Sequence, residues 1–257
     1  MNYYGKSDIG KVREENQDSF GITELLPGVY ICVVCDGMGG AAGGSIASQI
    51  AVEVFTDTVR EKLTPEPPAT YPDLGDRKVR QALVDAVDAA NLAVLNKARE
   101  RADGSLDGMG TTLTAVLFTE TGYAWSANVG DSRVYRVFPN GIRQLTHDHS
   151  VVQEYLDKGI ISSEDAKSFA MRNVITRAVG VASWVEADVE SVDIDPENGM
   201  NGSLLLCSDG LYNCVSDERI VALMGSGESI DRRADMLVKT ARKNGGPDNI
   251  TVIIVDL

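Results

Sequence analysis

At 257 residues, with 43% apolar and 24% charged residues, the chain is the size of a single α/β or α+β domain spanning residues 1–257. Its formal net charge of −14 argues against a nucleic-acid partner and against an anionic membrane surface, because both recruit Lys and Arg. No apolar run approaches the about 20 residues of a membrane span, and the polar start MNYYGKSD is not typical of a signal peptide, so we expect a cytoplasmic protein.

The first half of the chain predicts strands followed by two helices. Residues 1–36 contain two or three strand candidates, of which YICVVCD is the clearest. Apolar residues at helical spacing predict a helix over residues 45–63, with Ser45 as its possible N-cap. The proline-rich stretch TPEPPATYPDLGD predicts a loop, and a long amphipathic helix is predicted for residues 77–101.

The second half returns to strands. The runs TTLTAVLFT, YAWSANV and SRVYRVF, with turn residues between them, predict an antiparallel meander. Short helices follow over residues 150–172, then strands at ADVESVDI and GSLLLCSD, two helices within residues 216–243, and a last strand at NITVIIVDL. Antiparallel strands grouped between paired helices predict a layered α+β fold and not a doubly wound parallel sheet.

Four aspartates lie in short turn-forming clusters, and three of them follow an apolar run. They are Asp36 in CVVCDGMGG, Asp131 in ANVGDSR, Asp209 in LLLCSDG and Asp248 in GGPDNITVIIV. Strand ends are where loops and sites gather, so these carboxylates suggest hard oxygen ligands for divalent cations. Two carboxylates ~4 Å apart repel by roughly 4 kcal/mol at an effective dielectric of 20, and divalent cations reverse the sign of that term.

Cysteine and histidine give weaker signals. Cys32 and Cys35 invite a redox or zinc interpretation, but on a strand they point to opposite faces, which favours buried apolar cysteines. His147 and His149 could share one side of an extended segment, so a zinc site is geometrically possible; no third ligand is apparent, which favours structural histidines. Asp8 in SDIG resembles a ligand but is interpreted as a turn residue.

Eight motifs occur in order along essentially the whole chain. They are SDIGKVREENQDSF, DGMGG, GTT, NVGDSR, LTHDHS, TRAVG, CSDGL and DNITVI. Together they resemble the metal-dependent PP2C-type (PPM) protein serine/threonine phosphatases, and in length the chain is most similar to the bacterial stand-alone members. The resemblance implies a four-layer αββα sandwich of two antiparallel β-sheets flanked by helices, with a metal centre in a cleft at one end. It also implies hydrolysis of phosphoserine and phosphothreonine on proteins with Mn²⁺ or Mg²⁺.

The resemblance also assigns metal ligands residue by residue. Asp36 would bridge two ions, and the Gly37 carbonyl would serve one of them. Asp209 and Asp248 would complete the carboxylate set of the other ion. Asp131 with Asp209 would hold a third, weaker ion. Each aspartate taken alone is more typical of an ordinary turn residue, so these assignments depend on the ensemble.

The resemblance implies that the catalytic residues are Arg13, Asp18 and Asp36. Arg13 would bind the substrate phosphate through its planar fork, Asp18 would orient metal-bound waters, and a water bridging the two ions would attack without a covalent intermediate. Animal members carry a histidine, proposed as general acid, where this chain has Met38, and a glutamate where it has Gln17. Bacterial members commonly share both differences, which leaves the general acid unidentified.

Two other functions remain open at the level of sequence. A catalytically silent signalling module would be expected to lose metal aspartates, and here all are present. A metal-dependent phosphatase of small metabolites would keep them. The expected partners are phosphorylated proteins and a cognate eukaryotic-like Ser/Thr kinase, and the expected state is a monomer. The resemblance places a flap at about 151–172, with Lys158, Lys167 and Arg172, and we expect it to be mobile and to tune substrate choice.

Overall fold

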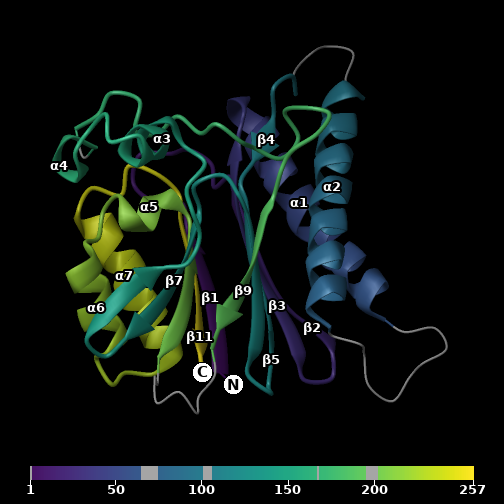
Figure 1. Ribbon diagram of the computed structural model, residues 1–257. Coiled ribbons are helices and arrows are strands. Elements are labelled where there is room, and N and C mark those ends of the chain that lie inside the picture. The colour runs from purple at the N-terminus through teal and green to yellow at the C-terminus, as the bar shows by residue number, and fades with distance from the viewer. Residues whose placement is uncertain (1, 65–74, 101–105, 167, 195–201) are drawn as a thin grey trace.

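The computed structural model describes residues 2–64, 75–100, 106–166, 168–194 and 202–257. Two antiparallel sheets face each other at its centre (Figure 1). The five-stranded sheet contains, in spatial order, β1 (Asn2–Asp8), β11 (Ile250–Asp256), β10 (Ser203–Cys207), β7 (Arg133–Phe138) and β8 (Gly141–Gln144). The six-stranded sheet contains β2 (Asp18–Leu26), β3 (Val29–Met38), β5 (Leu113–Thr119), β6 (Tyr123–Val129) and β9 (Asp188–Asp193), with β4 (Gly110–Thr111) paired to β3.

Helices cover the outer face of each sheet (Figure 1). The six-stranded sheet is covered by α1 (Gly40–Leu63) and α2 (Asp76–Arg99), and the five-stranded sheet by α5 (Asp209–Tyr212), α6 (Asp217–Met224) and α7 (Ile230–Lys243). The short helices α3 (Val151–Asp157) and α4 (Ser163–Ala166) lie at one end of the sandwich. The four-layer αββα architecture is therefore confirmed. None of the helices in the described ranges is both long and apolar enough to span a bilayer.

Three hydrophobic cores explain why the strands are apolar on both faces. In β10, Leu204 and Leu206 enter the core between the two sheets, whereas Leu205 and Cys207 pack under α6 and α7. A third core lies between the six-stranded sheet and α1 with α2. The continuous apolar runs of the sequence arise because each central strand is covered on both sides.

The two cysteines of YICVVCD point in opposite directions, as the strand period requires. Cys32 packs between the sheets, and Cys35 packs toward α1 and α2. Both are fully buried and free, and burial raises the pKa of each thiol well above its usual value. The prediction of buried apolar cysteines is confirmed.

The predicted start of the first helix is wrong. The helix begins at Gly40 after Gly39, whose φ of 107° is left-handed, so Ser45 lies inside α1 and does not cap it. Inside the helix, a Cβ on Gly44 would lie 2.8 Å from the Gly37 carbonyl carbon, so this glycine lets α1 pack closely against the end of β3. The predicted proline-rich loop falls largely on residues outside the described ranges.

The predicted three-strand meander is also wrong. Strands β5 and β6 pair antiparallel, but β7 pairs with β10 and β8 in the other sheet. The chain crosses between the sheets at Gly130, whose φ of 103° reverses its direction, followed by Asp131 and Ser132. The local alternation of apolar residues is the same in either sheet, so it cannot specify which sheet a strand joins. The crossing places Asp131 at the end of both sheets.

Candidate metal centre

The cleft at the strand ends brings the predicted site residues together. It has a volume of about 510 Å³, and Arg13, Asp36, Gly37, Asp131, Asp209 and Asp248 all line it. Asp18 lies beneath it, paired with Asp36 in the register of β2 and β3, and is only 7% exposed. Residues far apart in the sequence therefore meet in one polar cavity.

Asp36 is held by backbone contacts at the end of β3. Its N–H donates to Thr112 Oγ1 at 2.9 Å, and its carbonyl oxygen accepts from Thr111 Oγ1 and from the Thr112 N–H, both at 2.9 Å. Removal from water raises the pKa of the Asp36 carboxyl well above its usual value, and the charges of Asp18 and Asp209 raise it further. Asp36 is thus a rigidly placed carboxylate in a field of other carboxylates.

Gly37 is required by packing at this point. A Cβ there would lie 2.1 Å from the Gly44 carbonyl oxygen and 2.6 Å from the Gln17 carbonyl oxygen. The Gly37 N–H also donates to the Gln17 carbonyl at 3.1 Å. Any side chain would push α1 and the loop before β2 away from the cleft, so this glycine lets three backbone segments converge beside Asp36.

Asp18 is a buried carboxylate that keeps one oxygen unpaired. Ser208 Oγ donates to its Oδ2 at 2.7 Å, whereas its Oδ1 has no hydrogen-bond partner among the described residues. Burial raises the pKa of Asp18 to about 6, although the hydrogen bond from Ser208 opposes the shift. A buried oxygen of this kind is costly to leave unpaired, which points to a further partner in the cleft.

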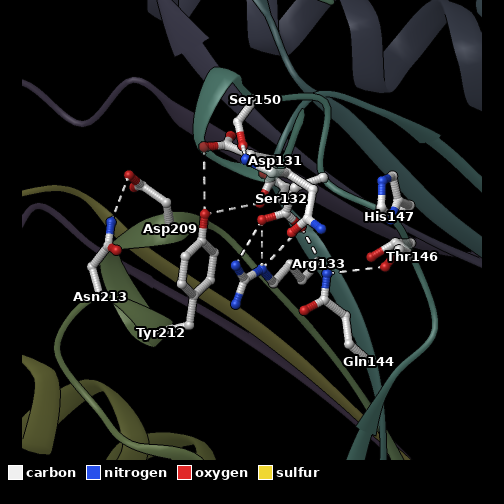
Figure 2. Close-up of polar contacts among 12 residues, drawn as sticks. Asp131, Ser132, Arg133, Gln144, Thr146, His147, Ser150, Asp209, Tyr212 and Asn213 are labelled. Carbon is white, nitrogen blue, oxygen red and sulfur yellow. Dashed lines mark hydrogen bonds and ion pairs between the residues drawn. The ribbon is translucent and has the colours of Figure 1, made fainter. Parts of the chain in front are cut away.

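Asp209, at the start of α5 just after β10, is also a carboxylate with one buried, unpaired oxygen. Asn213 Nδ2 donates to its Oδ2 at 3.0 Å, and its buried Oδ1 lacks a hydrogen-bond partner within the described chain. Burial raises the pKa of Asp209 to about 8, and the charges of Asp131 and Asp248 contribute further. Figure 2 shows Asp209 and Asn213 on one side of Tyr212, with Asp131 beyond its hydroxyl.

Asp131 lies on the turn between the two sheets and is 7% exposed. Burial raises its pKa to about 6, and the charge of Asp148 adds to this effect. Tyr212 donates its hydroxyl to the Asp131 carbonyl oxygen at 3.0 Å, and the same hydroxyl lies 3.4 Å from Asp131 Oδ2 (Figure 2). The carboxylate therefore has a fixed neighbour on the side of α5.

Arg13 and Asp248 lie in direct contact. Arg13 Nη2 donates to Asp248 Oδ2 at 2.7 Å, and the hydrogen bond and charge of Asp248 raise the pKa of Arg13. The Arg13 side chain is 53% exposed and remains accessible from solvent. Arg13, which is predicted to bind the substrate phosphate, therefore lies next to Asp248, which is predicted to bind a metal ion.

The loop that carries Arg13 is fixed by Asn249, a residue to which the sequence analysis gave no role. Asn249 Nδ2 donates to the carbonyls of Ile9 and Glu15 at 3.0 Å each, and its Oδ1 accepts from the Gln17 N–H at 2.8 Å. Asn249 follows Asp248 in the DNITVI motif, so its position in that motif was the available signal. Thr112 of the GTT motif likewise lines the cleft without having been assigned.

The histidines outside the cleft are hydrogen-bonded, as predicted. The His147 Nε2 lies 2.8 Å from Asp157, and the buried His149 Nε2 lies 3.1 Å from Asp188. His149 Nδ1 accepts from the Gly130 N–H at 3.1 Å, so it supports the turn that carries Asp131. Asp8 accepts from the Gly10 N–H at 2.9 Å, which confirms its role in a turn.

The cleft fits a hard divalent cation coordinated largely by water. No group of three or more His, Cys, Asp or Glu side chains in the described ranges is arranged so that it could hold a metal ion by itself. The fit comes instead from carboxylates that raise one another's pKa values and from the unpaired oxygens of Asp18 and Asp209. Mg²⁺ and similar ions use few carboxylates and keep several waters, which suits this open arrangement.

Comparisons with known proteins find phosphatases, which agrees with the residues that line the cleft. A family model described as protein phosphatase 2C matches residues 5–245. Serine/threonine phosphatase stp of Listeria welshimeri is 37% identical over 251 residues, which cover 98% of this chain and 94% of that protein. Serine/threonine protein phosphatase PstP of Mycobacterium tuberculosis is 35% identical over 257 residues, which cover 100% of this chain and 45% of that protein.

Solved structures give the same result. The S. agalactiae serine/threonine phosphatase superposes with a TM-score of 0.86 at 30% identity, covering 100% of this chain and 99% of that one. The catalytic domain of PstP, described in complex with 2 manganese ions, superposes with a TM-score of 0.80 at 32% identity, covering 99% and 97%. The chain therefore belongs to the protein phosphatase 2C family of serine/threonine phosphatases.

Proposed function

We propose that this chain hydrolyses phosphoserine and phosphothreonine on proteins in a reaction that requires Mn²⁺ or Mg²⁺. The observation that carries the proposal is the meeting of Asp36, Asp131, Asp209 and Asp248 with Arg13 in one cleft. Carboxylates gathered in this number suit hard divalent cations, and an arginine beside them suits a phosphate. The manganese complex described for a relative supports the choice of ion.

In this proposal the cleft residues divide between three ions. Asp36 and the Gly37 carbonyl, with Asp209 and Asp248, would hold two core ions, and Asp131 with Asp209 would hold a weaker third. Ions held there would supply Lewis-acid activation of water and would stabilise both the entering and leaving oxygens. In-line displacement by water needs no covalent intermediate, which agrees with the buried, high-pKa cysteines of this chain.

The protein's own groups bind and orient the substrate. Arg13 presents an exposed guanidinium beside Asp248, where it can donate two hydrogen bonds to a phosphate. Asp18, buried under Asp36 and held by Ser208, would orient water through its unpaired oxygen. Met38 lines the cleft, and its thioether carries no proton, so the leaving oxygen must be protonated by another group.

We further propose that the flap, residues 151–172, is mobile and tunes substrate choice. Its α3 and α4 border a cavity of about 400 Å³ that Arg172 and Tyr212 also line. Arg172 reaches a second cavity of about 380 Å³ that is lined by Arg13 and Asp209, so the flap adjoins the proposed phosphate site. Of its predicted cations, Lys167 lies outside the described residues. A chimera with a different flap should change relative rates on several phosphopeptides; unchanged ratios would reject this role.

The cellular setting is proposed from the family to which the chain belongs. The substrates would be phosphorylated proteins, and the counterpart a eukaryotic-like Ser/Thr kinase of the same cell whose modifications this monomeric enzyme removes. Free thiols at Cys32, Cys35, Cys207 and Cys214 support a reducing, cytoplasmic location.

A substrate comparison tests the proposed class. A phosphothreonine peptide and a sugar phosphate are supplied at equal concentration and equal Mn²⁺, and phosphate release is measured. The proposal expects a higher kcat/KM for the peptide. A higher value for the sugar phosphate would favour a phosphatase of small metabolites, and no release from either by folded protein would favour a silent binding module.

A further inference from the structure

The single turn of helix α5 carries Asp209, a predicted metal ligand, and Tyr212, which contacts Asp131, a second predicted metal ligand. Asp209 begins α5 and Tyr212 ends it, so the two side chains share one short, rigid element. Asp209 is fixed on one oxygen by Asn213, and its other oxygen is buried without a hydrogen-bond partner in the described chain. Figure 2 shows the Tyr212 hydroxyl between this carboxylate and the turn at Asp131.

The Tyr212 hydroxyl reaches Asp131 at two atoms. A phenol carries one proton, so the 3.0 Å contact to the Asp131 carbonyl oxygen is the main hydrogen bond, and Oδ2 at 3.4 Å shares the same hydrogen more weakly. The contact therefore fixes the backbone of Asp131 and limits the rotation of its carboxylate. Both effects act on the residue that the proposed function assigns to the third ion.

The ring of Tyr212 is itself held from behind. The Arg133 guanidinium carbon lies 3.6 Å from the ring centroid, a favourable cation–π geometry. Arg133 is in turn fixed by Asp148, a 4% exposed carboxylate that accepts from its Nε at 3.0 Å and from its Nη2 at 2.6 Å. Gln144 Nε2 also donates to Asp148 at 2.7 Å. The hydroxyl is thus placed by a buried frame and not by a freely rotating side chain.

We propose that Tyr212 is a positioning residue that fixes Asp131 relative to Asp209 and thereby sets the affinity of the weaker third cation position. The inference rests on the proposed function, because it presupposes that Asp131 and Asp209 share an ion. A tyrosine that only filled space would need the ring and its contact with Arg133. The hydroxyl contact to Asp131 is the additional feature that the proposal explains.

The test compares Tyr212→Phe with Tyr30→Phe. Phenylalanine keeps the ring against Arg133 but removes the hydroxyl from Asp131. Tyr30 is the matched control, because its hydroxyl donates to Glu120 Oε1 at 3.2 Å and no contact joins it to Asp131 or Arg133 in the described structure. Mn²⁺ binding is measured by calorimetry without substrate, and thermal unfolding is followed in EDTA.

We expect Tyr212→Phe to weaken only the lowest-affinity Mn²⁺ site, by about threefold to tenfold, with the tighter sites unchanged within about twofold. Tyr30→Phe should leave all sites unchanged. An unaltered weakest site in Tyr212→Phe would overturn the inference. So would equal weakening of every site in both variants, because that result would indicate general loosening of the fold.

A double-mutant cycle separates positioning from packing. Asp131→Asn is expected to lower turnover of an aryl phosphate, and Tyr212→Phe should add no further loss in that background if it acts through Asp131. An additive loss would overturn the inference. Wild-type protein with only two Mn²⁺ sites would reject the third position and this inference while leaving the two-ion function intact. Protein that binds Mn²⁺ normally but releases no phosphate would reject the proposed function alone, because the binding measurements on Tyr212 would still stand.

Discussion

Arg13 Nη2 donates a 2.7 Å hydrogen bond to Asp248 Oδ2, joining the predicted phosphate-binding residue to a predicted metal ligand across 235 positions of sequence. The contact places one positive charge at the rim of a cluster of carboxylates, where it offsets part of their mutual repulsion. It also orients the guanidinium at the cleft wall beside Asp209. A phosphate that enters the cleft would meet Arg13 already in position.

Substitution of Arg13 should mainly affect substrate binding. Arg13→Ala is expected to raise KM for a phosphothreonine peptide about tenfold with a smaller change in kcat, because binding of the ground-state phosphate is lost. Steady-state kinetics at saturating Mn²⁺ measures both. Lys11→Ala, a nearby exposed cation that does not line the cleft, is the control and should leave KM unchanged. An unchanged KM in Arg13→Ala would reject the phosphate role.

Substitution of Asp36 should separate activity from stability. Asp36→Asn is expected to abolish turnover, because it removes the ligand proposed to bridge both core ions. The same change should raise the Tm of the metal-free protein by a few degrees, since burial and the neighbouring carboxylates disfavour the charge of Asp36. Activity assays with Mn²⁺ and thermal unfolding in EDTA test the two parts. Near-normal turnover at saturating Mn²⁺ would contradict the two-ion assignment.

The stability of metal-free protein should fall as pH rises. The folded-state pKa values of Asp18 and Asp131 are raised to about 6 and that of Asp209 to about 8, all from 3.8. Between about pH 4 and pH 8 the folded state therefore binds more protons than the unfolded state, so the free energy of unfolding decreases with increasing pH. Mn²⁺ should counter this loss, because it stabilises the ionised carboxylates.

Thermal unfolding at pH 5, 6.5 and 8, with EDTA or with Mn²⁺, measures this effect. The Tm difference between the two conditions should widen as pH rises. Asp209→Asn is the control. In EDTA its Tm should fall less steeply with pH, because the substitution removes the carboxyl with the highest pKa of these three. A difference that narrows toward pH 8 would contradict the account.

The buried pair behind Tyr212 should matter for stability far more than exposed pairs. Asp148→Ala leaves the Arg133 charge without its carboxylate and is expected to cost about 3–5 kcal/mol of unfolding free energy. Arg232→Ala, which removes an exposed pair with Glu228, should cost less than about 1 kcal/mol. Urea denaturation of both variants gives the comparison. Equal effects would show that the Arg133 frame is not an important support.

The sequence was sufficient for the architecture and for the cleft residues only through the resemblance of its eight motifs to a known family, because no single aspartate differs from an ordinary turn residue. It was insufficient wherever distant packing decides. The first turns of α1 pack Gly44 against the backbone of Gly37, and β7 joins the five-stranded sheet after the crossing at Gly130. Neither contact has a local pattern that could predict it.

Second-layer contacts were missed for a related reason. Tyr212 directly follows the CSDGL motif, and nothing in its neighbours predicts a hydroxyl contact to Asp131. Asn249 was part of a recognised motif, but its three hydrogen bonds to the loop before β2 connect the two ends of the chain. Roles that arise from long-range contacts require the fold before they can be assigned.

The central claim is a metal-dependent protein phosphatase, and the most direct test is phosphate release from a phosphothreonine peptide as Mn²⁺ is titrated into EDTA-treated protein. We predict no release in excess EDTA and a rise to steady turnover as Mn²⁺ saturates, reversed when EDTA is restored. Equal release with and without metal would contradict the proposed chemistry, and no release at any Mn²⁺ concentration by folded protein would contradict the proposed function.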